Sequence, residues 1–117
     1  MCRLLGYVSE EPESAVESLG AAEFQTFTSL SALHGDGWGM AWSRPGSDGI
    51  DTATSPMSAA DDPAYVELAG RALGSAGLVH LRWATDGLAV HPMNTHPFSD
   101  GTHALAHNGS ISPIDTM

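Results

Sequence analysis

The sequence predicts an α+β domain in which two amphipathic helices alternate with short strands. The first helix is indicated by a capping-box pattern, Ser14-x-x-Glu17, followed by apolar residues at roughly helical spacing. The second is indicated by Asp62-Pro63, an N-cap residue followed by a first-turn proline. Short apolar runs between turn-forming residues predict strands. These runs cover residues 4–8, 38–42, 78–84 and 104–107.

The first third of the chain predicts a strand followed by a long helix. Leu4 to Val8 is an apolar run that leaves Cys2 at the mouth of the strand. The helix begins at Ser14, has a weak point at Gly20, and ends at Gly35-Asp36-Gly37. Its apolar positions are Val16, Leu19, Phe24, Phe27, Leu30 and Leu33.

The remaining two thirds predict three strands and one helix. A strand over residues 38–42 leads into a turn-rich stretch at residues 45–49, and the second helix ends near Gly74. Residues 78–84 form the clearest strand of the chain. Residues 85–103 form a long polar loop, of the kind that is usually functional in a compact domain. The core-facing residues expected on the second helix are Tyr65, Leu68, Ala69, Ala72 and Leu73.

Composition limits the classes of function. The 117 residues suit one domain, and fourteen acidic residues against four arginines give a formal net charge of −10. This charge disfavours binding to nucleic acid or to an anionic membrane surface. A single cysteine cannot form an internal disulfide, and Ser9-Glu10-Glu11-Pro12 interrupts any signal-peptide-like run. We therefore expect a cytoplasmic protein.

Met1-Cys2 is the most informative dipeptide of the chain. Removal of Met1 would leave Cys2 with a free α-amine beside its thiol. The thiolate is the nucleophilic form of cysteine, whose pKa is near ~8.5 when unperturbed. An α-amine titrates near ~7.7–8.0 and can accept the thiol proton at neutral pH. A lone cysteine near an N-terminus is more often an accident of sequence, so this assignment depends on other motifs.

Five ordered blocks supply that support. They are Met1-Cys2-Arg3-Leu4-Leu5-Gly6-Tyr7, His34-Gly35-Asp36-Gly37-Trp38-Gly39-Met40, Leu78-Val79-His80-Leu81-Arg82-Trp83-Ala84-Thr85, Asn94-Thr95-His96-Pro97-Phe98 and Ala104-Leu105-Ala106-His107-Asn108-Gly109-Ser110-Ile111. Together they resemble the class II glutamine amidotransferases, a family of N-terminal-nucleophile hydrolases. The Asp-Gly-Trp-Gly and Asn-Thr-His-Pro-Phe blocks resemble the stand-alone branch, which includes γ-glutamyl hydrolases of thiol-histidine biosynthesis, more than the glucosamine-phosphate synthases.

The resemblance implies a fold and a set of site residues. The fold is an αββα sandwich of two antiparallel sheets, of which residues 1–117 would form the N-terminal portion. Cys2 would be the nucleophile, Arg82 the clamp for the α-carboxylate of glutamine, and Trp83 and Thr85 part of the pocket wall. Asn108 and Gly109 would supply the oxyanion donors. The chemistry needs no cofactor.

The residues themselves leave alternatives open. Arg82 could lie at a sheet edge, paired with one of the many acids, and Asn108-Gly109 alone could be a tight turn. The histidines, above all His91, His96, His103 and His107, could suggest a metal site, but their spacing is too sparse for one. We expect instead that His96 fixes the loop bordering the site. His80 and His107 are expected to lie in strands with their polar atoms hydrogen-bonded. The Asp36–Gly39 block is expected to give structural support, because its glycines allow another segment of backbone to approach closely. Trp38 and Trp42 are expected in the core.

Two departures from the family affect the functional prediction. Asp86 stands where the glucosamine-phosphate synthases commonly have histidine, and the sequence ends at Met117, before any match to the family's amine-binding aspartate. Asp115 is too close to the turn to replace it. Two hypotheses follow: an enzyme that hydrolyses glutamine or a γ-glutamyl amide through a thioester at Cys2, or a truncated, inactive fragment that is stable only by self-association or with a partner. We expect a small-molecule substrate and, for the 117-residue chain alone, little glutaminase activity and a tendency to self-associate.

Overall fold

The computed structural model describes residues 2–30, 35–82 and 96–106, and it confirms an α+β fold with antiparallel strands. The described elements follow one another as β1 (Arg3–Glu13), α1 (Ala15–Leu19), α2 (Ala21–Ser29), β2 (Trp38–Ser43), β3 (Ile50–Ser55), the 3-10 helix η2 (Ala59–Asp61), α3 (Pro63–Arg71), β4 (Gly74–Leu81), β5 (Phe98–Ser99) and β6 (Ala104–Leu105). None of the described helices is long and apolar enough to cross a membrane.

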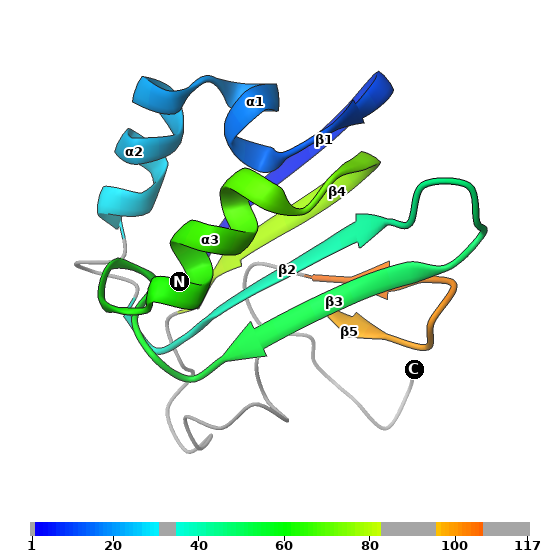
Figure 1. Ribbon diagram of the computed structural model, residues 1–117. Coiled ribbons are helices and arrows are strands. Elements are labelled where there is room, and N and C mark those ends of the chain that lie inside the picture. The colour runs from blue at the N-terminus through cyan, green and yellow to red at the C-terminus, as the bar shows by residue number, and fades with distance from the viewer. Residues whose placement is uncertain (1, 31–34, 83–95, 107–117) are drawn as a thin grey trace.

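The described strands form two antiparallel sheets. The larger sheet has the order β1-β4-β2-β3, and β5 pairs with β6 in the smaller one. The helices α1, α2 and α3 lie on one side of the larger sheet, whereas β5 and β6 lie on the other (Figure 1). The larger sheet is therefore the middle layer, with a helical face and a second face.

The main core lies between the larger sheet and the helices. Trp38, Met40, Val79 and Leu81 come from the central strands β2 and β4, and each is at most 2% exposed. The ring of Tyr65 on α3 stacks on Phe24 of α2, with centroids 5.7 Å apart, and meets the edge of Trp38 at 5.5 Å. These aromatic contacts join both long helices to the start of β2.

The first helical segment begins where the sequence predicts but is broken in two. The Ser14 hydroxyl accepts a hydrogen bond from the Glu17 N–H at 3.1 Å, and the Ser14 N–H donates to the Glu17 carboxylate at 3.3 Å. This confirms the capping box. The prediction of one continuous helix is wrong, because the chain turns at Gly20, where φ is +94°. Residues 31–34 lie outside the described part of the chain.

The strands differ from the sequence prediction in several places, and one of them, β5, lies within the predicted loop of residues 85–103. β1 continues to Glu13, well past Val8, and β4 begins at Gly74, which is therefore not the helix terminator. The edge strand β3 was not predicted, because its residues are mostly small or polar and only Ala53 packs against the core. Asp62 does cap α3, since its carboxylate accepts from the Ala64 N–H at 3.0 Å.

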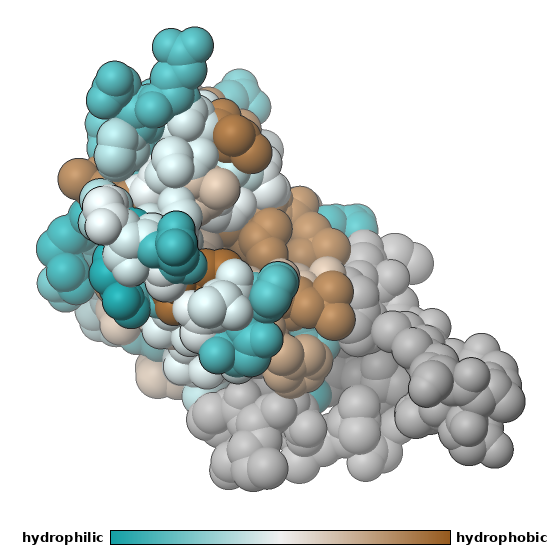
Figure 2. Space-filling model, turned by 90° about the vertical axis from the view of Figure 1, so that its right-hand side faces the viewer, coloured by the Kyte–Doolittle hydropathy of each residue, from teal (hydrophilic) through white to brown (hydrophobic). Residues whose placement is uncertain are grey.

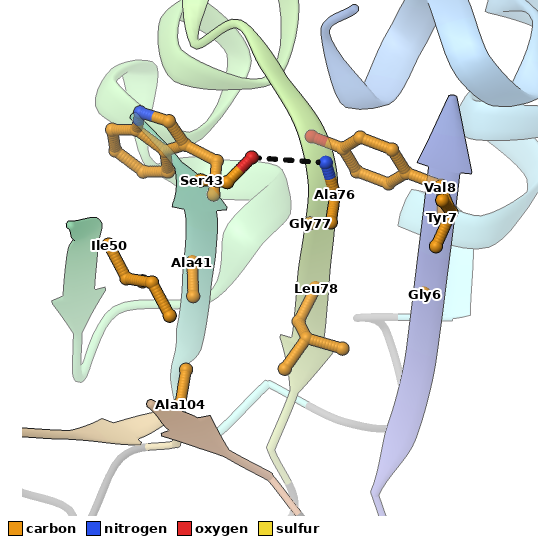
Figure 3. Close-up of a pocket in the computed structure, with 11 residues that line it drawn as sticks. Gly6, Tyr7, Val8, Ala41, Ser43, Ile50, Ala76, Gly77, Leu78 and Ala104 are labelled. Carbon is orange, nitrogen blue, oxygen red and sulfur yellow. Dashed lines mark hydrogen bonds between the residues drawn. The ribbon is translucent and has the colours of Figure 1, made fainter. Parts of the chain in front are cut away.

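The second face of the larger sheet carries small and apolar side chains. Because Leu5, Tyr7, Val79 and Leu81 pack into the helical core, the alternate residues of β1 and β4 point to the second face. A hollow of about 430 Å³ lies on this face. Its lining includes Gly6, Val8, Ala41, Ile50, Leu78 and, from β6, Ala104 (Figure 3).

Apolar side chains also reach the molecular surface. Val8 is 86% exposed and Leu105 is 59% exposed. Figure 2 shows apolar residues gathered in the middle of one side of the molecule, below a hydrophilic upper edge. Among the described residues, the second face therefore exposes apolar side chains such as Val8 to solvent.

Candidate active site

Cys2 and Arg82 come together at one end of the second face. Cys2 immediately precedes β1 and Arg82 immediately follows β4, and the last pair of the printed register is Arg3 with Leu81. One further antiparallel step places Cys2 opposite Arg82, with both side chains on the second face. Side chains opposed in this way have Cβ atoms roughly 4.5–5.5 Å apart. Both residues are buried, at 9% and 4% exposure.

The backbone of Arg82 is held by the segment that leads into β2. The Arg82 N–H donates to the Gly37 carbonyl at 2.9 Å, and the Arg82 carbonyl accepts from the Asp36 N–H at 3.0 Å. Gly37 has φ of +135°, a conformation that residues with a side chain rarely adopt. The Asp-Gly-Trp-Gly block therefore fixes the position of Arg82, in keeping with the structural role predicted for it.

The surroundings of Arg82 differ from those of Arg44 and Arg71. Arg44 pairs with Asp51 at 2.7 Å and Arg71 pairs with Glu67 at 3.2 Å, all at exposed positions. Arg82, in contrast, is buried after a strand that has β1 on one side and β2 on the other. The alternative of an edge position for Arg82 is therefore wrong. Its guanidinium supplies a buried positive charge on the face that carries Cys2.

A buried polar contact anchors the start of β2 beside this site. The Trp38 indole N–H donates to the Asp62 carboxylate at 2.9 Å, and the second carboxylate oxygen caps α3. Burial tends to raise the pKa of Asp62, but hydrogen bonds from Trp38, Ala64 and Ser55 lower it on balance. The ionised carboxylate thus holds Trp38, the residue that follows Gly37, against the helical layer.

A short segment, residues 96–98, crosses the second face next to Cys2 and Arg82. The imidazole of His96 lies 4.5 Å from that of His80, between ring centroids, and also 4.5 Å from the ring of Phe98. The backbone of His96 passes directly over Gly39, where a Cβ would lie 2.7 Å from Pro97 Cδ. This confirms the close approach predicted for the Asp-Gly-Trp-Gly block.

The structure thus brings together Cys2, Arg82, His80 and His96. The other predicted site residues, Trp83, Thr85, Asn108 and Gly109, lie outside the described residues, as do Asp86 and His107. The contact between His80 and His96 was missed, because nothing in their spacing shows that the loop returns to β4. Within residues 2–30, 35–82 and 96–106, no group of three His, Cys, Asp or Glu side chains is placed to hold a metal ion.

Comparison with known proteins identifies the family of the chain. All of residues 1–117 match the family described as "Glutamine amidotransferases class-II". The chain is 30% identical over 115 residues to a glutamine–fructose-6-phosphate aminotransferase (isomerizing) of Thermococcus kodakarensis, covering 95% of this chain and 17% of that protein. It is 34% identical over 118 residues to the enzyme of that name from Mycolicibacterium paratuberculosis, with 95% and 17% coverage.

A shorter match has higher identity. The aminotransferase of that name from Haemophilus influenzae is 49% identical over 39 residues, which is 33% of this chain and 6% of that protein. The chain spans only about a sixth of the length of the first two relatives. The match to the stand-alone branch stays a prediction. The family itself is shown by the match over the whole chain, and the protein belongs to the class II glutamine amidotransferases.

Proposed function

We propose that the intact protein hydrolyses the side-chain amide of glutamine, or of a γ-glutamyl compound, through a thioester on Cys2. The observation that carries the proposal is the placement of the single cysteine opposite a buried arginine on one face of the sheet. A nucleophile and a carboxylate-binding group then lie on neighbouring strands. Residues 83–95 and 107–117 enter the proposal only through the predicted roles of Trp83, Thr85, Asn108 and Gly109.

The combination of a thiol and a guanidinium suits an amino acid with a terminal amide. Glutamine has four carbon–carbon bonds between its α-carboxylate carbon and its amide carbon, which span roughly 5 Å when extended. The Arg82 side chain carries its guanidinium several bonds beyond its Cβ, so a substrate of this length can lie along the second face between the guanidinium and the Cys2 thiol. Arg82 can hold the α-carboxylate with two parallel hydrogen bonds while the amide carbon lies at the Cys2 sulfur.

The reaction needs only groups of the chain and water. After removal of Met1, the Cys2 α-amine takes the thiol proton, and the thiolate attacks the amide carbon to form a carbon–sulfur bond. Asn108 and Gly109 are proposed to donate hydrogen bonds to the tetrahedral oxyanion. The carbon–nitrogen bond then breaks as the α-ammonium returns its proton to the leaving ammonia or amine. Water hydrolyses the γ-glutamyl thioester and restores the thiol.

A second candidate is an inactive form of the chain that is stable only by self-association or with a partner. The observation that favours it is the apolar second face, where Val8 is 86% exposed and the hollow faces outward. A surface of this kind would pair readily with a second copy. For both candidates we propose a cytoplasmic location, in line with the composition.

Ammonia release and light scattering on one preparation separate the two candidates. We expect the intact protein to release ammonia from glutamine, Cys2→Ser to lose this activity almost completely, and His103→Ala to retain it. His103 is a suitable control because its side chain is 86% exposed in the turn between β5 and β6. Associated material without ammonia release would favour the inactive form, and undiminished activity in Cys2→Ser would exclude the thioester.

A further inference from the structure

The second face of the sheet consists of parallel rows of cross-strand neighbours. The row at the end of β4 holds Cys2, Arg82 and Gly37. The next row is made of Leu4, His80, Gly39 and Thr54, which are paired through the registers of all four strands. Rows along a strand are about 6.6 Å apart, because side chains on one face alternate with a rise of ~3.3 Å per residue. The hollow begins one row further on, at Gly6, Leu78 and Ala41.

Residues 96–98 lie over the second of these rows, and we call them the strap. Gly39 has no side chain, and the backbone of His96 fills the space that a Cβ would take. The His96 ring rests against His80, which is fully buried, and Phe98 adds a third ring to the column. Pro97 is buried as well. The strap is thus packed against the sheet through both its backbone and its rings.

The chain after the strap stays on the second face of the sheet. β5 begins at Phe98, and the turn that follows it is tied to β3, since the Gly101 carbonyl accepts from the Ile50 N–H at 2.9 Å. Ala104 of β6 then borders the hollow. The strap therefore separates the hollow from the row that holds Cys2 and Arg82.

We propose that His80 and His96 are positioning residues, whose packed rings hold the strap as a wall between Cys2 and the hollow. Cys2 is a diagonal neighbour of His80 across the β1–β4 pair, at a typical Cα separation of roughly 7–8 Å. A wall at this distance limits access to the thiol from the side of the hollow. It also confines a substrate whose carboxylate is held at Arg82 to the row where the thiol lies.

Ring packing, rather than imidazole chemistry, is the property that this role requires. Aromatic rings whose centroids lie about 4.5–7 Å apart stabilise one another through the apolar area that they bury and through their electric quadrupoles. Phenylalanine provides both. His96→Phe should therefore keep the wall, whereas His96→Ala should remove it. Gly39→Ala tests the same wall without altering any ring, because its methyl group would displace the strap backbone.

The test measures the alkylation rate of Cys2 by iodoacetamide in the intact protein, together with KM and kcat for glutamine. In His96→Ala we expect alkylation to be about tenfold faster, equivalent to ~1.4 kcal/mol in the barrier. We expect KM to rise about tenfold with kcat within about threefold of wild type. His96→Phe should stay within about twofold of wild type in both measurements, as should the exposed histidine control His103→Ala.

Phe98→Ala keeps the test decisive if the other variants fail to fold. Phe98 is 43% exposed, so its truncation does not open the core, and loss of one ring should speed alkylation about threefold. Unchanged alkylation in folded His96→Ala or Phe98→Ala would overturn the proposal, and so would equal effects of His96→Phe and His96→Ala.

The inference rests on the proposed function for the role of Cys2, but alkylation needs no turnover. A wild-type protein without glutamine turnover would refute the proposed function. The alkylation rates would still show whether the strap limits access to the Cys2 thiol.

Discussion

Removal of the Asp62 carboxylate should destabilise the protein by a predictable amount. Asp62→Ala deletes the side-chain cap of α3, which costs about 1 kcal/mol. It also leaves the Trp38 indole N–H buried without its acceptor, which costs about 1–3 kcal/mol. The expected loss in the free energy of unfolding is therefore about 2–4 kcal/mol. Urea unfolding followed by tryptophan fluorescence measures it.

A double-mutant cycle with Trp38→Phe tests the reasoning behind this magnitude. In the Trp38→Phe background no indole N–H is left unpaired, so Asp62→Ala should cost only about 1 kcal/mol for the lost cap. The coupling between the two positions should then be about 1–3 kcal/mol. A coupling under about 0.5 kcal/mol, the usual limit of additivity, would refute the claim that Asp62 anchors the start of β2.

The same contact predicts a pH dependence with a defined sign. The pKa of Asp62 is lower in the folded protein than its ordinary value of 3.8. Its contribution is therefore fully present above the unfolded pKa and is lost as the pH falls through the folded pKa. The stability difference between wild type and Asp62→Ala should stay constant from neutral pH to about pH 5 and shrink below about pH 4. A difference that grew on acidification would contradict the assignment.

Three further substitutions test the site. Arg82→Lys should raise KM for glutamine by roughly 10–100-fold with a smaller change in kcat, because a point charge replaces a two-pronged clamp; an unchanged KM in steady-state assays would make Arg82 structural. Gly37→Ala should cost about 1–3 kcal/mol in urea unfolding, because φ is +135° there, and a fully stable variant would show that this conformation is not required. Asn108→Ala should lower kcat by roughly 10²–10³-fold with little effect on KM, and kcat near wild type would remove Asn108 from the oxyanion site.

Much of the fold could be predicted because local signals determine where its elements begin. Ser14 and Asp62 cap their helices in the structure, since short polar side chains there satisfy free backbone N–H groups. Strand β2 begins at Trp38 as predicted, and Trp38 is buried in the core. These signals depend only on neighbouring residues, so no knowledge of the tertiary structure is needed to use them.

The elements that were missed depend on long-range contacts. β3 has no apolar pattern of its own and exists because β2 offers it a ladder of hydrogen bonds. The strap could be suspected from His96-Pro97, but its partner His80 lies on a strand sixteen positions earlier and is identified only by the fold. The sequence makes Arg82 a candidate, yet only the sheet order shows that it is not at an edge.

The proposed thioester on Cys2 can be observed through the intact mass of the protein before and during reaction with glutamine. We expect the active protein to lack Met1 and rapid acid quenching to trap one γ-glutamyl group, which peptide mapping should place on Cys2. A glutamine-mimicking electrophile should label that same residue alone. Retention of Met1 in active protein, or a trapped group on any residue other than Cys2, would contradict the proposed mechanism.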